Sequence, residues 1–209
     1  MRSKRHHGDQ KLALATALLQ RHYIQRSTGE EWNKITIGRT PHGKPFHPNL
    51  HYNLSKAGGV VVLVGYTEAI GVDIIRKDRS QFKTADLIDL FSPRELIPPR
   101  EEKWAVEDRH LIGWAFKEAY MKFIGKPEWD RITSFEFLET QVPGAGEISL
   151  DCSAYVEGVK QQCYTEIHNV NDTHFIAIYT ATAPSSTDKE REKFRSLTLQ
   201  EITPKNQEI

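Results

Sequence analysis

The stretch GWAFKEAYMKFIG (residues 113–125) carries Trp, Phe, Tyr, Met and Ile side chains at helical spacing and ends on a glycine. Glycine suits the position that closes a helix, and Pro127 follows two residues later. The pattern predicts one long helix over residues 104–123. The same stretch also holds Lys117, Glu118 and Lys122, which is unusual in a helix so rich in apolar side chains.

Three side chains of this predicted helix share one stripe. Trp114, Glu118 and Lys122 are spaced i, i+4 and i+8, and the neighbouring stripe is apolar and would face the core. Taken alone, Glu118 and Lys122 would form an exposed ion pair worth about 0.3–0.5 kcal/mol. Trp114 is expected to pack against the core rather than to take part in chemistry.

A second carboxylate, Asp73, stands in the apolar run AIGVDII (residues 69–75). Burial without a partner would be costly, so two interpretations stay open: a carboxylate satisfied in a turn at a strand end, or a metal ligand. Asp73 and Glu118 together would give Mg²⁺ two oxygen ligands, and water and phosphate oxygens would complete its shell. Lys122, one turn beyond Glu118, could then neutralise the same phosphates.

The charge of the chain is balanced as a whole but uneven along its length. The 209 residues have a formal net charge of zero, with 38% hydrophobic and 27% charged residues, so no nucleic-acid or membrane partner is expected. Residues 1–45, however, carry nine Lys or Arg against three acids. A basic face suits an anionic ligand such as a phosphorylated nucleotide, although on this count alone a solvated surface is the preferred interpretation.

The start of the chain and the cysteines bear on the compartment. The segment MRSKRHHGDQ lacks the apolar core of a secretory leader, and no apolar run approaches the ~20 residues of a membrane span. Cys152 and Cys163 are isolated and make a weak metal site. The sequence therefore predicts a cytoplasmic protein.

The first half of the chain predicts a helix over residues 10–26, closed by Gly29. The Pro- and Gly-rich segment RTPHGKPFHP (residues 39–48) is typical of a loop. The three residues between the apolar runs 60–65 and 69–75 favour a hairpin. Strands are predicted over residues 32–38, 60–65 and 69–75.

The second half predicts a helix over residues 80–97 that ends at Pro98-Pro99, and then the long helix. Beyond Pro184 the chain is polar and charged, so residues 184–209 are expected to be disordered. Helices followed by antiparallel strands indicate an α+β fold. A meander of four strands is predicted over residues 134–139, 153–159, 163–170 and 174–182.

Two short motifs in this order resemble the signature of the 4′-phosphopantetheinyl transferases of the larger, surfactin-synthetase-activating type, which includes the eukaryotic aminoadipate-reductase-activating proteins. They are GVD (residues 71–73) and WAFKEAYMKFIG (residues 114–125). Three upstream segments are also similar to the family: GDQKLALATALLQR (residues 8–21), RTPHGKPF (residues 39–46) and HYNLSKAGGVVVLVG (residues 51–65). The order of the segments makes the resemblance specific.

The resemblance implies transfer of the 4′-phosphopantetheine arm of coenzyme A to a serine of an apo acyl or peptidyl carrier protein, with release of adenosine 3′,5′-bisphosphate. It implies a Mg²⁺ cofactor held by Asp73 and Glu118, and a catalytic set of Asp73, Glu118 and Lys122. Glu118 would also help to deprotonate the acceptor serine, and Lys122 would stabilise charge on the diphosphate. Residues expected to bind coenzyme A are Arg21, Arg39, Lys44, Ser55, Lys56 and Lys122.

The family fold implied is a pseudo-twofold pair of similar α/β subdomains with antiparallel sheets, acting as a monomer. The expected division is residues 1–68 on the adenine and 3′-phosphate side, residues 69–183 on the metal and catalytic side, and a polar tail over residues 184–209. Family members carry a strand before the first helix, so the N-terminal edge is expected to be truncated or the chain to begin late.

Two positions depart from the family pattern. Many bacterial members have a second acid two residues after the first, where this chain has Ile75. The His of the family's Ser-His pair is Lys56 here, and an ammonium cannot reproduce the geometry of an imidazole. Glu95 matches an acid after the family's F(S/T) turn and is given little weight.

Three functional hypotheses follow. The first is a working Mg²⁺-dependent transferase, and the second is a degenerate homologue that binds coenzyme A or a carrier protein without chemistry. The third is an interaction protein whose basic face meets an acidic partner, which would bind polyphosphates without preference and weaken steeply with salt. The third leaves the acid in the apolar run around Asp73 unexplained.

Overall fold

A computed structural model describes residues 2–77, 87–97, 105–138, 142–149, 152–183 and 194–203. Two long helices dominate it: α1 (Arg2–Thr28) and α3 (Val106–Ile124). Gly125 ends α3 with a φ of 72°, in the left-handed region that glycine adopts most easily. Both helices were predicted and are confirmed. Among the described helices none is both long and apolar enough to cross a membrane.

A tight hairpin follows α1. Strand β3 (His51–Ala57) pairs antiparallel with β4 (Val60–Tyr66), and Gly58 and Gly59 between them both have positive φ. A two-residue turn of this kind needs positive φ at both positions, which glycine supplies without a steric cost. The predicted hairpin between residues 60–65 and 69–75 is therefore wrong, because β4 is paired with the strand before it.

Strand β5 (Ile70–Arg76) instead belongs to a four-stranded antiparallel sheet in the order β5-β11-β10-β7. Its partner β11 (His174–Thr180) lies about a hundred residues further along the chain, with Ala177 opposite Asp73. The other two strands are β10 (Tyr164–Val170) and β7 (Ile148–Ser149). β5 is buried on both faces, which explains why its sequence is almost continuously apolar.

The two faces of the four-stranded sheet have separate cores. On one face, Ile75 and Phe175 pack with Phe116 of α3 in the larger cluster of buried side chains. On the other face, Val72 and Ile178 pack with Val62 of β4. The sheet is thus held between α3 on one side and the β3–β4 hairpin on the other.

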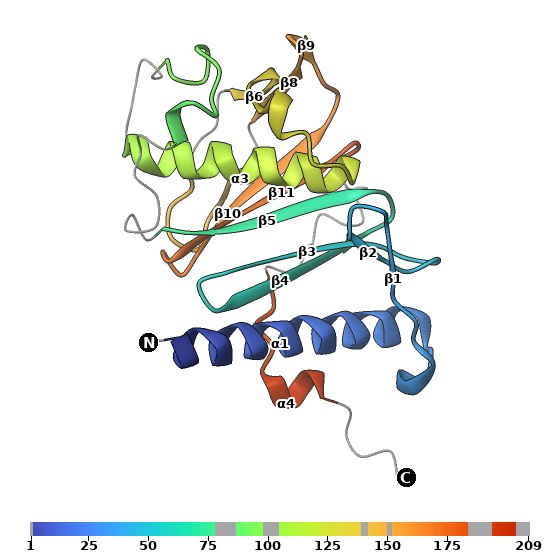
Figure 1. The fold of residues 1–209 in the computed structure, drawn as a ribbon. Helices are drawn as coiled ribbons and strands as arrows, with labels where there is room; N and C mark the ends of the chain where they lie inside the picture. The colour runs from blue at the N-terminus through green and yellow to red at the C-terminus, as the bar shows by residue number, and fades with distance from the viewer. Residues whose placement is uncertain are drawn as a thin grey trace.

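Figure 1 shows this layering as α3, the four-stranded sheet, the β3–β4 hairpin and α1, from top to bottom. Each half has one long helix beside antiparallel strands, so the α+β fold class is confirmed. The remaining elements form two small sheets, β1-β2 and β6-β8-β9, and two 3₁₀ helices. Their bounds are η1 Trp32–Lys34, β1 Gly38–Arg39, β2 Pro45–Phe46, η2 Trp129–Ser134, β6 Phe135–Leu138, β8 Ser153–Val156 and β9 Val159–Lys160.

Three local predictions differ from the structure. The strand predicted over residues 32–38 is a 3₁₀ turn at Trp32–Lys34, in which the Lys34 amide donates to the Glu31 carbonyl. The four-strand meander is wrong, because β8 pairs with β6 and β9 while β10 pairs with β11 and β7. Of the helix predicted over residues 80–97, residues 87–88 are helical and residues 89–97 form turns and bends, while its earlier part and Pro98-Pro99 lie outside the described residues.

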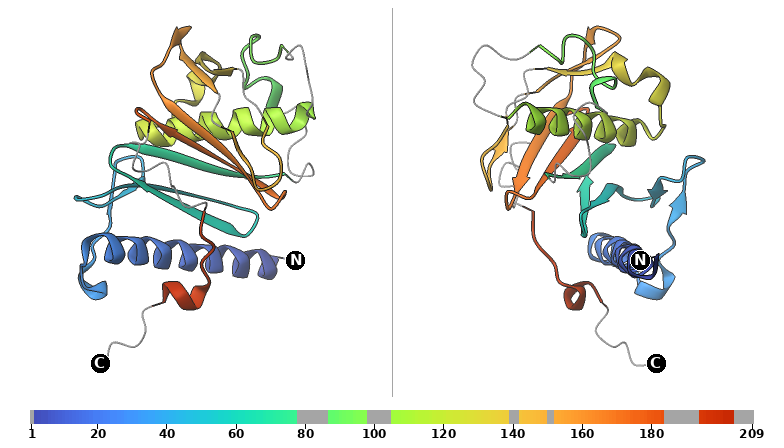
Figure 2. Two further views of the ribbon diagram at one scale, coloured as in Figure 1. Left: turned by 180° about the vertical axis from the view of Figure 1, so that it is seen from behind. Right: turned by 60° about the vertical axis from the view of Figure 1, so that its left-hand side comes forward.

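Part of the tail expected to be disordered is ordered. Residues 194–203 cross to the N-terminal half and end in α4 (Leu199–Ile202), which begins with a capping box at Thr198 and Glu201. Ile202 is buried, and Phe194 packs against the core cluster between the β3–β4 hairpin and the four-stranded sheet. Figure 2 shows this segment descending from the sheet to α4 beside α1. Residues 184–193 and 204–209 lie outside the described part of the chain.

Candidate active site

Asp73 lies in the middle of β5, not in a turn at its end, and is 7% exposed. Ser55 of β3 donates its hydroxyl to Asp73 Oδ1 over 2.7 Å. Lys122 of α3 places its ammonium 2.5 Å from the same oxygen and 2.8 Å from the Ser55 hydroxyl. The carboxylate is therefore satisfied by two side chains, one from each half of the molecule.

A glycine brings α3 close enough to β5 for these contacts. A Cβ on Gly71 would lie 1.8 Å from the carbonyl oxygen of Ala119 and 2.7 Å from the amide nitrogen of Phe123. No side chain fits there, so only glycine allows the helix backbone to rest on the strand. Since Ala119 directly follows Glu118, this contact also carries Glu118 to the level of Asp73.

Glu118 lines the same cleft as Asp73 and Lys122. Burial raises the pKa of the Glu118 carboxyl above its ordinary value of 4.5, and the nearby charge of Asp73 raises it further, while Lys122 acts in the opposite direction. The two carboxylates therefore line one cleft, and Asp73 lies near enough to Glu118 for its charge to disfavour ionisation of Glu118. A perturbed acid in a cleft is also a common feature of catalytic sites.

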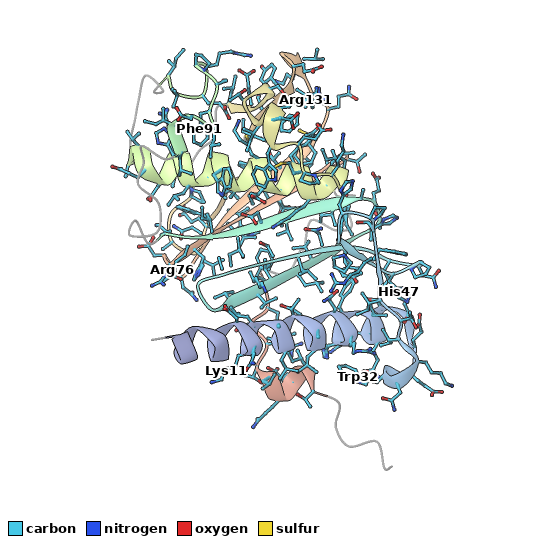
Figure 3. All side chains as sticks on the ribbon, in the orientation of Figure 1. Lys11, Trp32, His47, Arg76, Phe91 and Arg131 are labelled. Atoms are coloured by element: carbon cyan, nitrogen blue, oxygen red, sulfur yellow. The ribbon has the colours of Figure 1, made fainter. Side chains whose placement is uncertain are left out.

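The cleft has a volume of about 680 Å³ and runs between the two long helices, over the adjacent edges of β3 and β5. Its size is within the usual range for a pocket that binds a small molecule or cofactor. Figure 3 shows Arg76 at one end of β5 and His47 toward the other side of the molecule. The lining residues are Ala13, Thr16, Ala17, Gln20, Arg39, Gly43, Pro45, Leu54–Ala57, Asp73–Arg76, Trp114, Glu118 and Lys122.

Lys117 points away from this cleft and has no exposed surface. Its ammonium donates to Glu95 Oε2 and to the carbonyl of Ile132, each over 2.9 Å, and also to the carbonyl of Phe135. Glu95 in turn accepts the amide of Phe137 over 3.1 Å. The helix thus carries three charges in six positions because one lies in a buried ion pair and two face the cleft.

Two protein-family models match the chain that forms this cleft. Residues 2–68 match the model described as "4'-phosphopantetheinyl transferase, N-terminal", and residues 69–179 match the 4'-phosphopantetheinyl transferase superfamily model. The chain belongs to the 4′-phosphopantetheinyl transferase superfamily.

Curated relatives support the same family. The human L-aminoadipate-semialdehyde dehydrogenase-phosphopantetheinyl transferase is 24% identical over 188 residues, which covers 81% of this chain and 61% of the human protein. The phosphopantetheinyl transferase of Thraustochytrium is 28% identical over 192 residues, covering 81% of this chain and 64% of that protein. The chain therefore spans about three-fifths of the length of these relatives.

Some of the residues expected from the phosphopantetheinyl transferase pattern line the cleft, and others hold the backbone of the segments around it. Arg39, Ser55 and Lys56 line the cleft, together with the three catalytic candidates. Arg21 does not: its guanidinium donates to the carbonyls of Trp32 and Ile35 over 2.9 and 3.1 Å, and so fixes the segment that follows α1.

Lys44 also supports the site instead of lining it. Its ammonium donates to the carbonyl of Lys122 near the C-terminal end of α3, where a positive charge is favourable. Burial lowers the pKa of Lys44. Because it holds the backbone of Lys122, Lys44 links the loop after β1 to the end of α3.

The donor set suits a hard divalent cation. Two carboxylates and a hydroxyl, from Asp73, Glu118 and Ser55, border one open cleft, and Mg²⁺ commonly uses one or two carboxylates with waters and substrate phosphates. Ile75 lines the cleft on the face of β5 that also bears Asp73, so no third carboxylate is supplied there. In the described part of the chain, no cluster of three or more His, Cys, Asp or Glu is arranged to hold a metal.

Sequence patterns did not indicate three contributors to the site. Asn53 accepts the amide of Val72 over 3.2 Å and ties β3 to β5. Arg76, three residues after Asp73, borders the cleft. Trp129 stacks on Trp114 with ring centroids 5.7 Å apart, so Trp114 both packs against the core and borders the cleft. The alternation of side chains along β5 could have shown that the strand ends near Arg76. The contacts of Asn53 and Trp129 could not be predicted in this way, because each joins two different elements.

Proposed function

We propose that this chain transfers the 4′-phosphopantetheine arm of coenzyme A to a serine of an apo carrier protein or carrier domain. The observation that carries the proposal is the grouping of Asp73, Glu118 and Lys122 in one cleft of a superfamily member. Coenzyme A as the donor, adenosine 3′,5′-bisphosphate as the second product, and the site residues are all parts of this proposal.

In the proposed reaction the serine oxygen attacks the phosphorus that bears the pantetheine arm. A new P–O bond forms to serine, and the bond to the bridging oxygen of the diphosphate breaks, which releases adenosine 3′,5′-bisphosphate. Glu118 accepts the proton of the serine hydroxyl, a role favoured by its raised pKa. Lys122 stabilises the charge that develops on the leaving oxygen.

The remaining basic side chains hold the donor. Arg39 and Lys56 border the cleft and would contact phosphate groups of coenzyme A. Mg²⁺, held by Asp73 and Glu118, would act as a Lewis acid on the diphosphate when bound. The division into a coenzyme A side (residues 1–68) and a catalytic side (residues 69–183), a monomeric state and action in the cytoplasm complete the proposal.

The test is incubation with coenzyme A, Mg²⁺ and a panel of purified apo carrier proteins, followed by mass spectrometry of the carriers. We expect one carrier to gain the mass of the phosphopantetheine arm, with no gain for a carrier whose acceptor serine is replaced by alanine. Absence of any gain over the whole panel, with protein that is folded by circular dichroism, would count against transfer.

A second candidate is a homologue that binds coenzyme A without chemistry. Lys56 and Ile75, which depart from the family pattern inside the cleft itself, favour it. It predicts coenzyme A binding that calorimetry finds nearly independent of Mg²⁺ and little changed by Glu118→Ala. A large loss of affinity in that variant would exclude this candidate.

A further inference from the structure

The ammonium of Lys122 occupies the position from which a cation would approach Asp73. It lies 2.5 Å from Asp73 Oδ1, on a carboxylate whose side chain is only 10% exposed. The Lys122 side chain is 28% exposed and sits at the border of the cleft. The contact is therefore close, and the lysine still has open space into which it could turn.

A divalent cation shared by Asp73 and Glu118 would compete with this ammonium. An ammonium in contact with one oxygen of a carboxylate repels a second cation that binds either oxygen of the same group, since the distance between the charges stays within a few ångströms. Lysine is a point charge on a flexible stem of four carbons, so it can exchange one anionic partner for another.

The charges of the three groups indicate when this exchange is favourable. Asp73 and Glu118, when ionised, bring two negative charges, and Lys122 brings one positive charge. A divalent cation that bound alone would therefore leave the site with an excess of positive charge. It would also leave Lys122 without its carboxylate partner. A diphosphate that enters with the cation supplies negative charge and gives Lys122 a new partner.

We infer that Lys122 is a displaceable cation: it neutralises Asp73 in the ligand-free protein and moves to the diphosphate when coenzyme A binds, so that divalent metal binding depends on the diphosphate. The inference rests on the proposed function, because it takes the metal and the diphosphate from it. The Ser55 hydroxyl donates to Asp73 Oδ1, and we expect this bond to keep the carboxylate oriented when Lys122 moves away.

The test is the binding of Mn²⁺, followed through the electron paramagnetic resonance signal of the free ion, with and without coenzyme A. We expect weak binding by the wild-type protein alone and an affinity at least about tenfold higher with coenzyme A. Adenosine 3′,5′-bisphosphate, which lacks the diphosphate, should give a much smaller gain. Lys122→Gln, which keeps a hydrogen-bond donor and removes the charge, should raise the affinity for Mn²⁺ alone by about tenfold and so reduce the gain that coenzyme A gives.

The inference is overturned if Lys122→Gln leaves Mn²⁺ binding unchanged or weaker in the absence of coenzyme A. Lys126→Gln is the matched control, because Lys126 is exposed and pairs with Glu128 outside the cleft; it should leave Mn²⁺ binding as in the wild type. Asp73→Asn separates the two levels of the argument. If Asp73→Asn leaves Mn²⁺ binding intact, the metal site of the proposed function is wrong as well. If Asp73→Asn abolishes Mn²⁺ binding while Lys122→Gln leaves it unchanged, only the displacement of Lys122 is overturned.

Discussion

At the scale of single residues, the role of a charged side chain depends more on the groups that it contacts than on its position in a motif. Spacing alone pairs Lys122 with Glu118, one turn away on the same helix, but Lys122 contacts Asp73, 49 residues away in the sequence. The motif could therefore name the site residues, while the contact that satisfies Asp73 depends on the packing of α3 against β5. The same limit applies to Arg21, whose partners are backbone carbonyls that no motif records.

Glu118→Gln tests whether this carboxylate is kept for activity at the expense of stability. Burial and Asp73 raise the pKa of Glu118 in the folded protein, so the folded state binds a proton more readily than the unfolded state between pH 4.5 and the raised value. Stability is therefore lost as pH rises through this window. In metal-free buffer at pH 7 we expect Glu118→Gln to raise the Tm by about 2–4 °C, the shift that ~1 kcal/mol produces in a domain of this size.

The pH dependence is the control for this interpretation. Below pH 4.5 Glu118 is protonated in both states, so the advantage of Glu118→Gln should vanish there. An equal Tm difference at pH 4 and pH 7 would contradict the assignment. Transfer activity should be lost in the variant at every pH, since the amide cannot accept the serine proton.

The proposed base also sets the acid limb of the pH–rate profile. Because the pKa of Glu118 is raised above 4.5 in the metal-free protein, we expect kcat/KM for coenzyme A, which reports on the free enzyme, to fall on the acid side at a pH above that ordinary value. Steady-state rates with a fixed carrier between pH 4.5 and 8 measure this. A profile that stays flat down to the ordinary carboxyl value would show that Glu118 is not the group that titrates.

At the scale of elements, local patterns predicted helices and strands well but not their pairing. The C-terminal end of α3 was visible because Gly125 and Pro127 are specific signals for a helix end. The partner of β5 was not, because β11 is a hundred residues away and the short link after β4 imitates a hairpin loop. The Gly58-Gly59 turn was the stronger signal, since both residues have the positive φ that a two-residue hairpin requires.

Gly71→Ala tests the close approach of α3 to β5. A Cβ 1.8 Å from the Ala119 carbonyl cannot be accommodated by a side-chain rotation, so the helix must shift away from the strand. We expect a loss of about 3 kcal/mol or more in the free energy of unfolding, measured by urea titration. Gly8→Ala in α1 is the matched control, because nothing lies within 4 Å of its Cβ position and alanine should stabilise the helix by up to about 1 kcal/mol.

The buried ion pair makes a second prediction about α3. Lys117→Met removes the counter-charge of the buried Glu95, which must then stay ionised in the core or take up a proton, so we expect a loss of about 3–5 kcal/mol in the free energy of unfolding. Adding Glu95→Gln should recover part of this loss, because the amide removes the charge and its single oxygen still accepts one of the two backbone amides, of Ser92 or Phe137, that Glu95 binds. Strictly additive losses in the double variant would mean that the two groups are not coupled.

At the scale of the whole molecule, the two halves meet along a seam without backbone pairing. β3 and β5 run side by side, yet neither is paired with the other in a sheet, and the links described between them are side-chain contacts such as Asn53 with Val72 and Ser55 with Asp73. On the opposite face of β5 from Asp73, the apolar cluster shared by β4 and the four-stranded sheet joins the two halves. The site therefore lies at the junction of the two halves, where side chains of β3, β5 and α3 meet.

The C-terminal segment bridges this seam on the side away from the cleft. Phe194 packs against the core cluster of Val62, Val72 and Ile178, with its ring 4.8 Å from that of His168. Eight residues later, Ile202 is 6% exposed in α4, which contacts α1. The polar composition of the tail concealed both anchors, because single apolar residues at positions 194 and 202 produce no periodic pattern.

Phe194→Ala and Ile202→Ala should each loosen the junction of the two halves. We expect each to lower the free energy of unfolding by about 2 kcal/mol, below the usual cost for a core phenylalanine because Phe194 is only half-buried. Hydrogen exchange followed by mass spectrometry should show faster exchange in α1 and β4, with α3 less affected because its core lies on the other face of the sheet. Arg195→Ala is the matched control on the same segment, since its exposed ion pair with Glu201 is worth less than about 1 kcal/mol. If both core variants behave like Arg195→Ala, the segment rests on the surface without holding the halves together, and the seam is stabilised by the β4 face and the β3–β5 contacts.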